Sequence, residues 1–159
     1  MSNTNYQHAI LIRTYKRPDL LEKCLASLDK QNFKKFNIYI CDDSMSEINK
    51  QVIEIYKMKL NIFYFKNSRQ LKYSSMTFNE VLSKVKFERF ISILDDDDLW
   101  DEDRMMEVNK HTSMGYRWVT HYYKFTTNTS LKEYDNVIFK HKMICLLYTS
   151  DAADDTPCV

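Results

Sequence analysis

Short apolar runs bounded by polar residues recur along most of the chain. Runs of this kind are typical of buried strands. The strands predicted on this basis, in chain order, are His8–Arg13, Phe36–Cys41, Asn61–Lys66, Arg89–Leu94 and Arg117–Phe125. The segment Tyr134–Ile144 fits neither a strand nor a helix pattern clearly.

Stretches with helical spacing separate these runs. Pro18 suits the first turn of a helix that extends to Asp29, and Ser44 or Ser46 is expected to cap the next helix. A fourth helix is predicted over Asp101–Thr112. The apolar faces expected of the second and third helices are Ile48, Val52, Ile55 and Tyr56, and Phe78, Val81, Leu82 and Val85.

Strands that alternate with helices through short connections predict one α/β domain with a mainly parallel sheet and helices on both faces. Such a sheet binds ligands in the crevice beyond the carboxyl ends of its strands. The residues after four of the predicted strands carry charges of both signs, which points to a site there. They are Arg13, Thr14, Tyr15, Lys16 and Arg17; Asp42 and Asp43; Asn67, Ser68, Arg69 and Lys72; and Asp95, Asp96, Asp97 and Asp98.

Composition excludes several classes of protein. The chain has a single glycine, Gly115, among 159 residues, whereas a dinucleotide-binding GxGxxG turn or a Walker loop needs more. A net charge of +1 argues against a nucleic-acid partner. Four cysteines without paired spacing indicate neither a zinc site nor a disulfide framework. With no apolar run long enough for a membrane span, a reducing, cytoplasmic setting is expected.

The last residues form a separate unit. The run CLLYTSDAAD, which starts at Cys145, resembles a translated sequencing-library adapter. We therefore expect residues 1–144 to form the domain, truncated at its C-terminus, and residues 145–159 to be a non-native tail.

The four consecutive aspartates are the sharpest chemical feature. Adjacent carboxylates at the end of a buried strand repel one another unless a cation is present, and hard oxygen ligands suit magnesium or manganese. Asp95 and Asp97 form a DxD pair that can face one cavity. A solvated loop that caps the following helix is the plainer alternative. An aspartyl-phosphate phosphatase, with Asp95 as nucleophile and Asp97 as acid/base, is a distant one.

The acidic pair after the second strand and the basic group after the first extend this site. Asp42 and Asp43 offer carboxylates to a ribose or a base, although an Asx turn can occupy one of them. Arg13, Lys16 and Arg17 can neutralise a diphosphate.

Three segments resemble the opening signatures of family-2 glycosyltransferases with the Rossmann-like GT-A fold: ILIRTYKRPDLLEKCLASL, FNIYICDDS and FISILDDDDLW. The resemblance implies an inverting transfer of a sugar from a nucleotide-diphosphate donor to an acceptor hydroxyl, helped by manganese or magnesium. It implies Asp97 and Asp95 as metal ligands and places the general base beyond Ile144. The donor-binding residues that it implies, together with the basic group, are Thr14, Tyr15, Arg17, Asp42, Asp43, Asn79, Asp95 and Asp98.

The chain departs from the family pattern at a few positions. Arg13 stands where a small hydroxyl residue is common, Phe78 where an arginine precedes Asn79, and Glu102 where a proline is frequent. The family analogy makes a UDP-sugar the expected donor and a saccharide or glycan intermediate the expected acceptor, with peripheral membrane association left open. A nucleotidyltransferase and a catalytically inert nucleotide-sugar-binding fragment are the alternatives.

Overall fold

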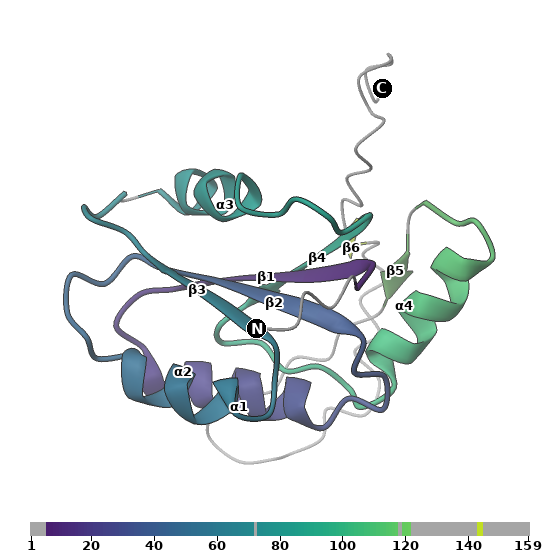
Figure 1. Ribbon diagram of the computed structural model, residues 1–159, viewed down its shortest axis with the longest axis horizontal. Helices are drawn as coiled ribbons and strands as arrows, with labels where there is room; N and C mark the ends of the chain where they lie inside the picture. The colour runs from purple at the N-terminus through teal and green to yellow at the C-terminus, as the bar shows by residue number, and fades with distance from the viewer. Residues whose placement is uncertain (1–5, 72, 118, 122–142, 145–159) are drawn as a thin grey trace.

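Four parallel strands form the central sheet of the computed structural model, in the spatial order β3-β2-β1-β4 (Figure 1). The structure describes residues 6–71, 73–117, 119–121 and 143–144. The strands are β1 His8–Thr14, β2 Phe36–Asp42, β3 Ile62–Lys66 and β4 Phe90–Asp95, and a short antiparallel pair joins β5 Thr120–His121 to β6 Met143–Ile144. The predicted α/β class with a mainly parallel sheet is confirmed.

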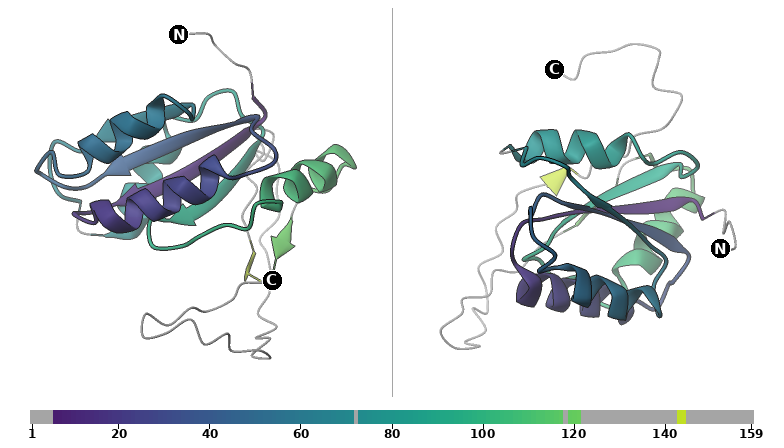
Figure 2. Two further views of the ribbon diagram at one scale, coloured as in Figure 1. Left: turned by 90° about the horizontal axis from the view of Figure 1, so that it is seen from below. Right: turned by 60° about the vertical axis from the view of Figure 1, so that its left-hand side comes forward.

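Helices lie on both faces of this sheet, as the sequence predicts. They are α1 Pro18–Asp29, α2 Lys50–Lys57, α3 Ser74–Leu82 and α4 Arg104–Ser113. α1 and α2 cover one face and α3 covers the other, while α4 lies beyond the sheet (Figures 1 and 2). None of the helices in the described ranges is long and apolar enough to cross a bilayer.

Alternation along the strands divides the core into two layers. Ile10 and Ile12 of β1 pack with Leu21 and Leu25 of α1, all fully buried. The neighbouring positions of β1 face α3, where Val81 is buried. Because each buried leucine contributes about 2 kcal/mol, the apolar face of α1 is what fixes this helix to the sheet.

The second helix corrects one prediction. Ile53 and Tyr56 are its buried residues, whereas Ile48 and Ile55 are exposed. The predicted apolar face was counted from Ile48, which precedes the helix and does not share its geometry. Neither predicted serine caps it, because the N-cap residue is Asn49 and makes no side-chain cap bond.

Two further element boundaries are also corrected. α4 begins at Arg104, three residues after the predicted start at Asp101, because residues 101–103 form a turn. Of the predicted fifth strand, only Thr120–His121 is a strand among the described residues, and positions 122–125 lie outside them.

The strand order determines where a crevice opens at the carboxyl edge of the sheet. β2 and β3 extend the sheet on one side of β1, whereas β4 lies on the other side. The connections that leave β1 and β4 therefore diverge, which opens a crevice at the carboxyl ends of these strands. The parallel register pairs Arg13 with Asp95 across this point.

Candidate nucleotide-binding site

A cavity of about 150 Å³ lies at this edge of the sheet. It is open to solvent and lies between the loop after β1 and the segment that leads into α3. Its lining combines basic, acidic, hydroxyl and aromatic groups, which is the composition of a polar ligand site and not of an apolar core void. The lining residues are Arg13, Thr14, Tyr15, Arg17, Asp43, Gln70, Tyr73 and Thr77.

Four of these residues were predicted to bind a donor: Thr14, Tyr15, Arg17 and Asp43. The loop after β1 brings three of them together because β1 ends at Thr14 and α1 starts at Pro18. Lys16 between them has a φ of 51°, a left-handed conformation that is uncommon for residues other than glycine, asparagine or aspartate. Its backbone N–H donates to Ser44 Oγ at 2.7 Å, which holds the strained loop in place.

The two aspartates that end β2 have separate surroundings. Asp42 is fully buried: its Oδ1 accepts from Ser44 N at 2.8 Å and from Asn49 Nδ2 at 3.1 Å, and its Oδ2 accepts from Tyr64 Oη at 2.9 Å. Oδ1 thus holds the β2–α2 loop and Oδ2 bonds to β3, and Asp42, although it is predicted to contact the donor, is not among the residues that line the cavity. The bond from Ser44 is the Asx turn that the sequence left open for one of the pair.

Asp43 does line the cavity. Its Oδ1 accepts from Asn67 Nδ2 at 2.9 Å and from Leu71 N at 2.8 Å, and its Oδ2 accepts from the same amide of Leu71 at 3.1 Å. These bonds tie the segment after β3 to β2. Among the described residues Oδ2 accepts only from this shared donor, so it has lone-pair capacity for a ligand N–H.

The aspartate quartet forms a tight turn directly after β4. Asp98 N donates to the carbonyl oxygen of Asp95 at 3.0 Å. The carboxylates of Asp95 and Asp97 are partly exposed, at 38% and 47%, whereas that of Asp96 is fully buried. The turn thus presents the two members of the DxD pair and encloses the residue between them.

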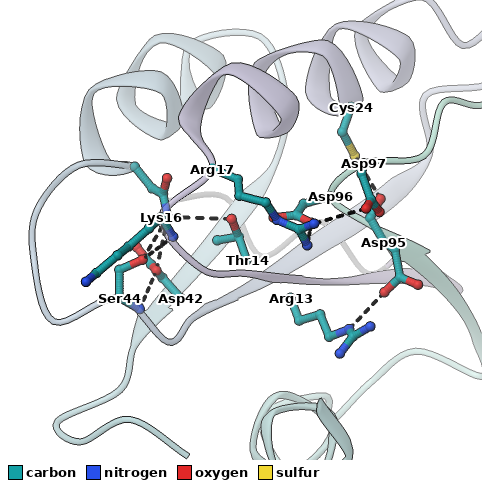
Figure 3. Close-up of polar contacts among 11 residues, drawn as sticks. Arg13, Thr14, Lys16, Arg17, Cys24, Asp42, Ser44, Asp95, Asp96 and Asp97 are labelled. Carbon is teal, nitrogen blue, oxygen red and sulfur yellow. Dashed lines mark hydrogen bonds and ion pairs between the residues drawn. The ribbon is translucent and has the colours of Figure 1, made fainter. Parts of the chain in front are cut away.

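Two arginines from the other side of the crevice hold this turn (Figure 3). Arg13 Nε donates to Asp95 Oδ1 at 2.8 Å. Arg17 Nη1 donates to Asp97 Oδ2 at 3.0 Å, and its Nε and Nη2 both donate to Asp96. The basic and acidic groups that the sequence placed after different strands therefore meet directly.

The charges of the turn remain incompletely balanced. Burial raises the pKa of Asp96, although Thr14 and Arg17 oppose this, and the Asp97 charge adds to it. Partial burial and the charges of Asp97 and Asp95 raise the pKa of Asp98. Carboxylates with a raised pKa next to one another indicate a place where an added cation is stabilising.

The carboxylates of the quartet fit a cation whose remaining ligands come from the substrate and from water. No group of three or more histidine, cysteine or acidic residues able to hold a metal is found in the described ranges. Mg²⁺ and Mn²⁺ in nucleotide sites need only one or two carboxylates, because substrate phosphates and waters supply the other ligands. Asp97 and Asp95 are carboxylates of this kind. They are not among the residues that line the cavity, but each is paired with an arginine that is, Asp97 with Arg17 and Asp95 with Arg13.

Asn79 lies on α3 with an exposed side chain and is not among the lining residues. Sequence reasoning missed Gln70, Tyr73 and Thr77, which reach the cavity from the segment after β3. Their position after a parallel strand was the available signal. The sequence pattern draws attention instead to the charged and polar neighbours in the same segment, such as Arg69, which does not line the cavity.

The loop after the quartet is anchored to α1. Trp100 is buried, its backbone N–H donates to Ser27 Oγ at 3.2 Å, and the Arg104 guanidinium lies 3.9 Å from the centre of its ring. The Trp100 backbone therefore ties the loop to α1, while its buried ring packs against Arg104.

Comparisons with known proteins agree with this architecture. The solved structure of TarS from S. aureus superposes with a TM-score of 0.65 at 19% identity, covering 80% of this chain and 24% of that one. TarS residues 1–349 in complex with UDP-GlcNAc gives a TM-score of 0.63 at 22% identity, covering 68% and 31%. A mannosyltransferase from Pyrobaculum calidifontis, in complex with GDP-Man and Mn²⁺, gives 0.56 at 15%, covering 64% and 30%. These likenesses define the fold as GT-A-like.

The family follows from sequence matches. The model of the family "Glycosyl transferase family 2" matches residues 9–150. A GalNAc(5)-diNAcBac-PP-undecaprenol beta-1,3-glucosyltransferase of Campylobacter jejuni is 30% identical over 112 residues, which is 70% of this chain and 36% of that protein. The chain belongs to glycosyl transferase family 2 and spans about a third of the length of this relative.

Proposed function

We propose that the chain is the donor-binding part of a metal-dependent, inverting glycosyltransferase that moves a sugar from a nucleotide diphosphate to an acceptor hydroxyl. One observation supports this most: a single cavity is lined by Asp43 and by the two arginines that hold the aspartate turn. A nucleotide-diphosphate sugar has an N–H-bearing base at one end and a diphosphate at the other, and this cavity offers a partner for each.

The nucleoside would lie at the Asp43 end. A carboxylate oxygen accepts the imide or amino N–H of a base, and the rings of Tyr15 and Tyr73 line the same cavity. Because an aromatic ring stacks on any base, the choice between bases would depend on hydrogen bonds such as the one to Asp43. Because TarS was solved with UDP-GlcNAc, we propose a UDP-sugar as the donor.

The diphosphate would lie at the aspartate end, with Mn²⁺ or Mg²⁺ bound by Asp97 and Asp95. A cation there would supply Lewis-acid stabilisation of the negative charge on a departing diphosphate. Asp96 stays with Arg17 and holds the turn in position. The mannosyltransferase neighbour that was solved with Mn²⁺ supports this assignment.

The acceptor side completes the proposal. Inversion needs a general base on the sugar face opposite the leaving group, and we place this base beyond Ile144. The Campylobacter relative is named for an undecaprenol-linked glycan. We therefore propose a saccharide or glycan intermediate as the acceptor and a cytoplasmic, membrane-peripheral location.

Isothermal titration of the chain with UDP and GDP, in Mn²⁺ and in EDTA, tests donor binding. We expect one nucleoside diphosphate to bind in Mn²⁺ and affinity to fall about tenfold or more in EDTA, since a bridging cation is worth at least 1.4 kcal/mol. Asp97→Asn should abolish the difference between Mn²⁺ and EDTA. Asp101→Asn, a matched change in the exposed turn before α4, should preserve it.

Thermal unfolding of each variant verifies that it is folded. The proposal fails if the folded wild-type chain binds neither nucleotide, or if EDTA and Asp97→Asn leave the affinity unchanged.

A further inference from the structure

Arg13 is an unusual residue for its place in the fold. It is the penultimate residue of β1, a strand whose preceding positions from His8 to Ile12 are all buried. Alternation along the strand puts Arg13 on the α3 face, next to Asp95 in the parallel register. A guanidinium at the end of such a strand needs partners on that face.

The structure supplies two partners that fix its orientation. Nε donates to Asp95 Oδ1 at 2.8 Å (Figure 3), and the guanidinium carbon lies 5.2 Å from the centre of the Phe78 ring on α3. The attraction of the aromatic ring keeps the guanidinium over the face of Phe78, and the hydrogen bond to the Asp95 carboxylate fixes the direction in which Nε points. This contact joins β1 to α3.

Arg17 and Arg13 differ in what remains available to a ligand. Arg17 donates through Nε, Nη1 and Nη2 to Asp96 and Asp97. For Arg13, the donation among the described residues is from Nε to Asp95. Its two terminal nitrogens carry N–H groups beyond this bond, and the residue lines the same cavity as Asp43.

We propose that Arg13 binds the phosphate groups of the nucleotide donor and that Phe78 and Asp95 hold its guanidinium in position for this contact. The inference rests on the proposed function, because it names a phosphate-binding residue of the same site. The edge of a planar guanidinium that carries its two terminal nitrogens forms paired hydrogen bonds to phosphate oxygens, which lysine cannot reproduce. Arg13 lines the cavity and also bonds to the aspartate turn, so it lies where the proposed diphosphate would connect the two.

The test compares nucleotide with nucleoside binding in Mn²⁺. NMR titrations of the chain with UDP and uridine, and with GDP and guanosine as the second pair, give both affinities. Arg13→Met keeps an aliphatic contact with Phe78 but removes the donors. We expect its affinity for the nucleoside diphosphate to fall about tenfold or more, as for loss of a charge-assisted hydrogen bond, and nucleoside affinity to change by less than about threefold.

Two further variants separate phosphate binding from a structural role. Arg13→Lys retains the charge and should recover only part of the lost diphosphate affinity. Arg89→Met removes another arginine that lies over an aromatic ring, Phe90, at the opposite end of β4 and should leave both affinities at wild-type values.

Each outcome is decisive. A diphosphate-specific loss in Arg13→Met supports the proposal, as does an intermediate value for Arg13→Lys. Equal weakening of nucleotide and nucleoside, or no weakening, overturns it and leaves the proposed function standing. Failure of the wild-type chain to bind any nucleoside diphosphate refutes the proposed function itself.

Discussion

Asp42 and Asp43 are chemically identical neighbours with different roles, because β2 ends between them. Asp42 is the last residue of the strand and points into the protein, where Ser44, Asn49 and Tyr64 occupy its oxygens. Asp43 is the first residue past the strand and faces the cavity. A shift of one residue along the chain thus decides whether the carboxylate bonds inside the protein, as in Asp42, or faces the cavity as a candidate ligand-binding group, as in Asp43.

The charge of Asp98 costs stability in the folded chain, because the carboxylate is partly desolvated and lies near Asp97 and Asp95. Its folded-state pKa is raised, so the proton is held more tightly in the folded chain. Below the unfolded pKa there is no penalty, and as pH rises through the folded pKa the penalty develops in full. At pH 7 we expect Asp98→Asn to increase the free energy of unfolding by about 0.5 kcal/mol, the scale of an exposed charge interaction.

Urea unfolding between pH 4 and pH 7 measures this effect. Asp98→Asn should remove part of the decline in stability as pH rises through this window. Asp19→Asn is the control, because that exposed acid lies in the first turn of α1, where a negative charge is favourable. Equal stability gains in both variants would show that the effect is one of net charge and not of the quartet.

At the scale of elements, Arg17 connects the start of α1 to the turn after β4. It is the N-cap residue of α1 and makes no cap bond with its side chain, which instead pairs with the buried Asp96. An ion pair between the partly exposed Arg17 and the buried Asp96 therefore bridges the crevice between β1 and β4. Removing one partner of such a pair leaves the other uncompensated.

Arg17→Met is expected to lower the free energy of unfolding at pH 7 by about 2–3 kcal/mol, the cost of an unpaired buried charge. The double variant Arg17→Met/Asp96→Asn should recover most of this loss, since no buried charge remains. Chemical denaturation of the four proteins of this cycle gives the coupling energy directly. A double variant no more stable than Arg17→Met would mean that the arginine acts through packing alone.

The elements themselves were largely predictable because their signals are local. Pro18 marked the start of α1, and the apolar runs located the four strands of the sheet to within one or two residues. The N-cap residues of α2 and α4 make no side-chain cap bond, so the sequence holds no clear marker of where these helices begin. The predicted start of α4 is therefore too early, and the predicted apolar face of α2 includes residues that are exposed.

The site was predictable only in part, for a different reason. The topology rule brought the residues after β1, β2 and β4 to one edge, and the structure shows them there. Which side chain of a pair faces the cavity depends on the residue at which a strand ends, and this separated Asp42 from Asp43. Gln70, Tyr73 and Thr77 were missed because a loop and the start of a helix position them, without a periodic pattern.

Across the whole molecule, the order β3-β2-β1-β4 is what turns scattered motifs into one site. β4 returns to the side of β1 opposite β2, so the aspartate turn meets the loop that leaves β1 (Figure 2). Arg13 and Arg17 then lie between Asp43 and the quartet. We propose that a nucleotide diphosphate spans this distance, with its base at Asp43 and its phosphates at the arginines and aspartates.

A crystal structure of the chain with UDP and Mn²⁺ tests that claim most directly. We expect the base to lie within hydrogen-bond distance of Asp43, the diphosphate beside Arg13, and the cation to be bound by Asp97 and the phosphates. A nucleotide bound elsewhere, or a cation at Asp97 that does not touch the diphosphate, would contradict it.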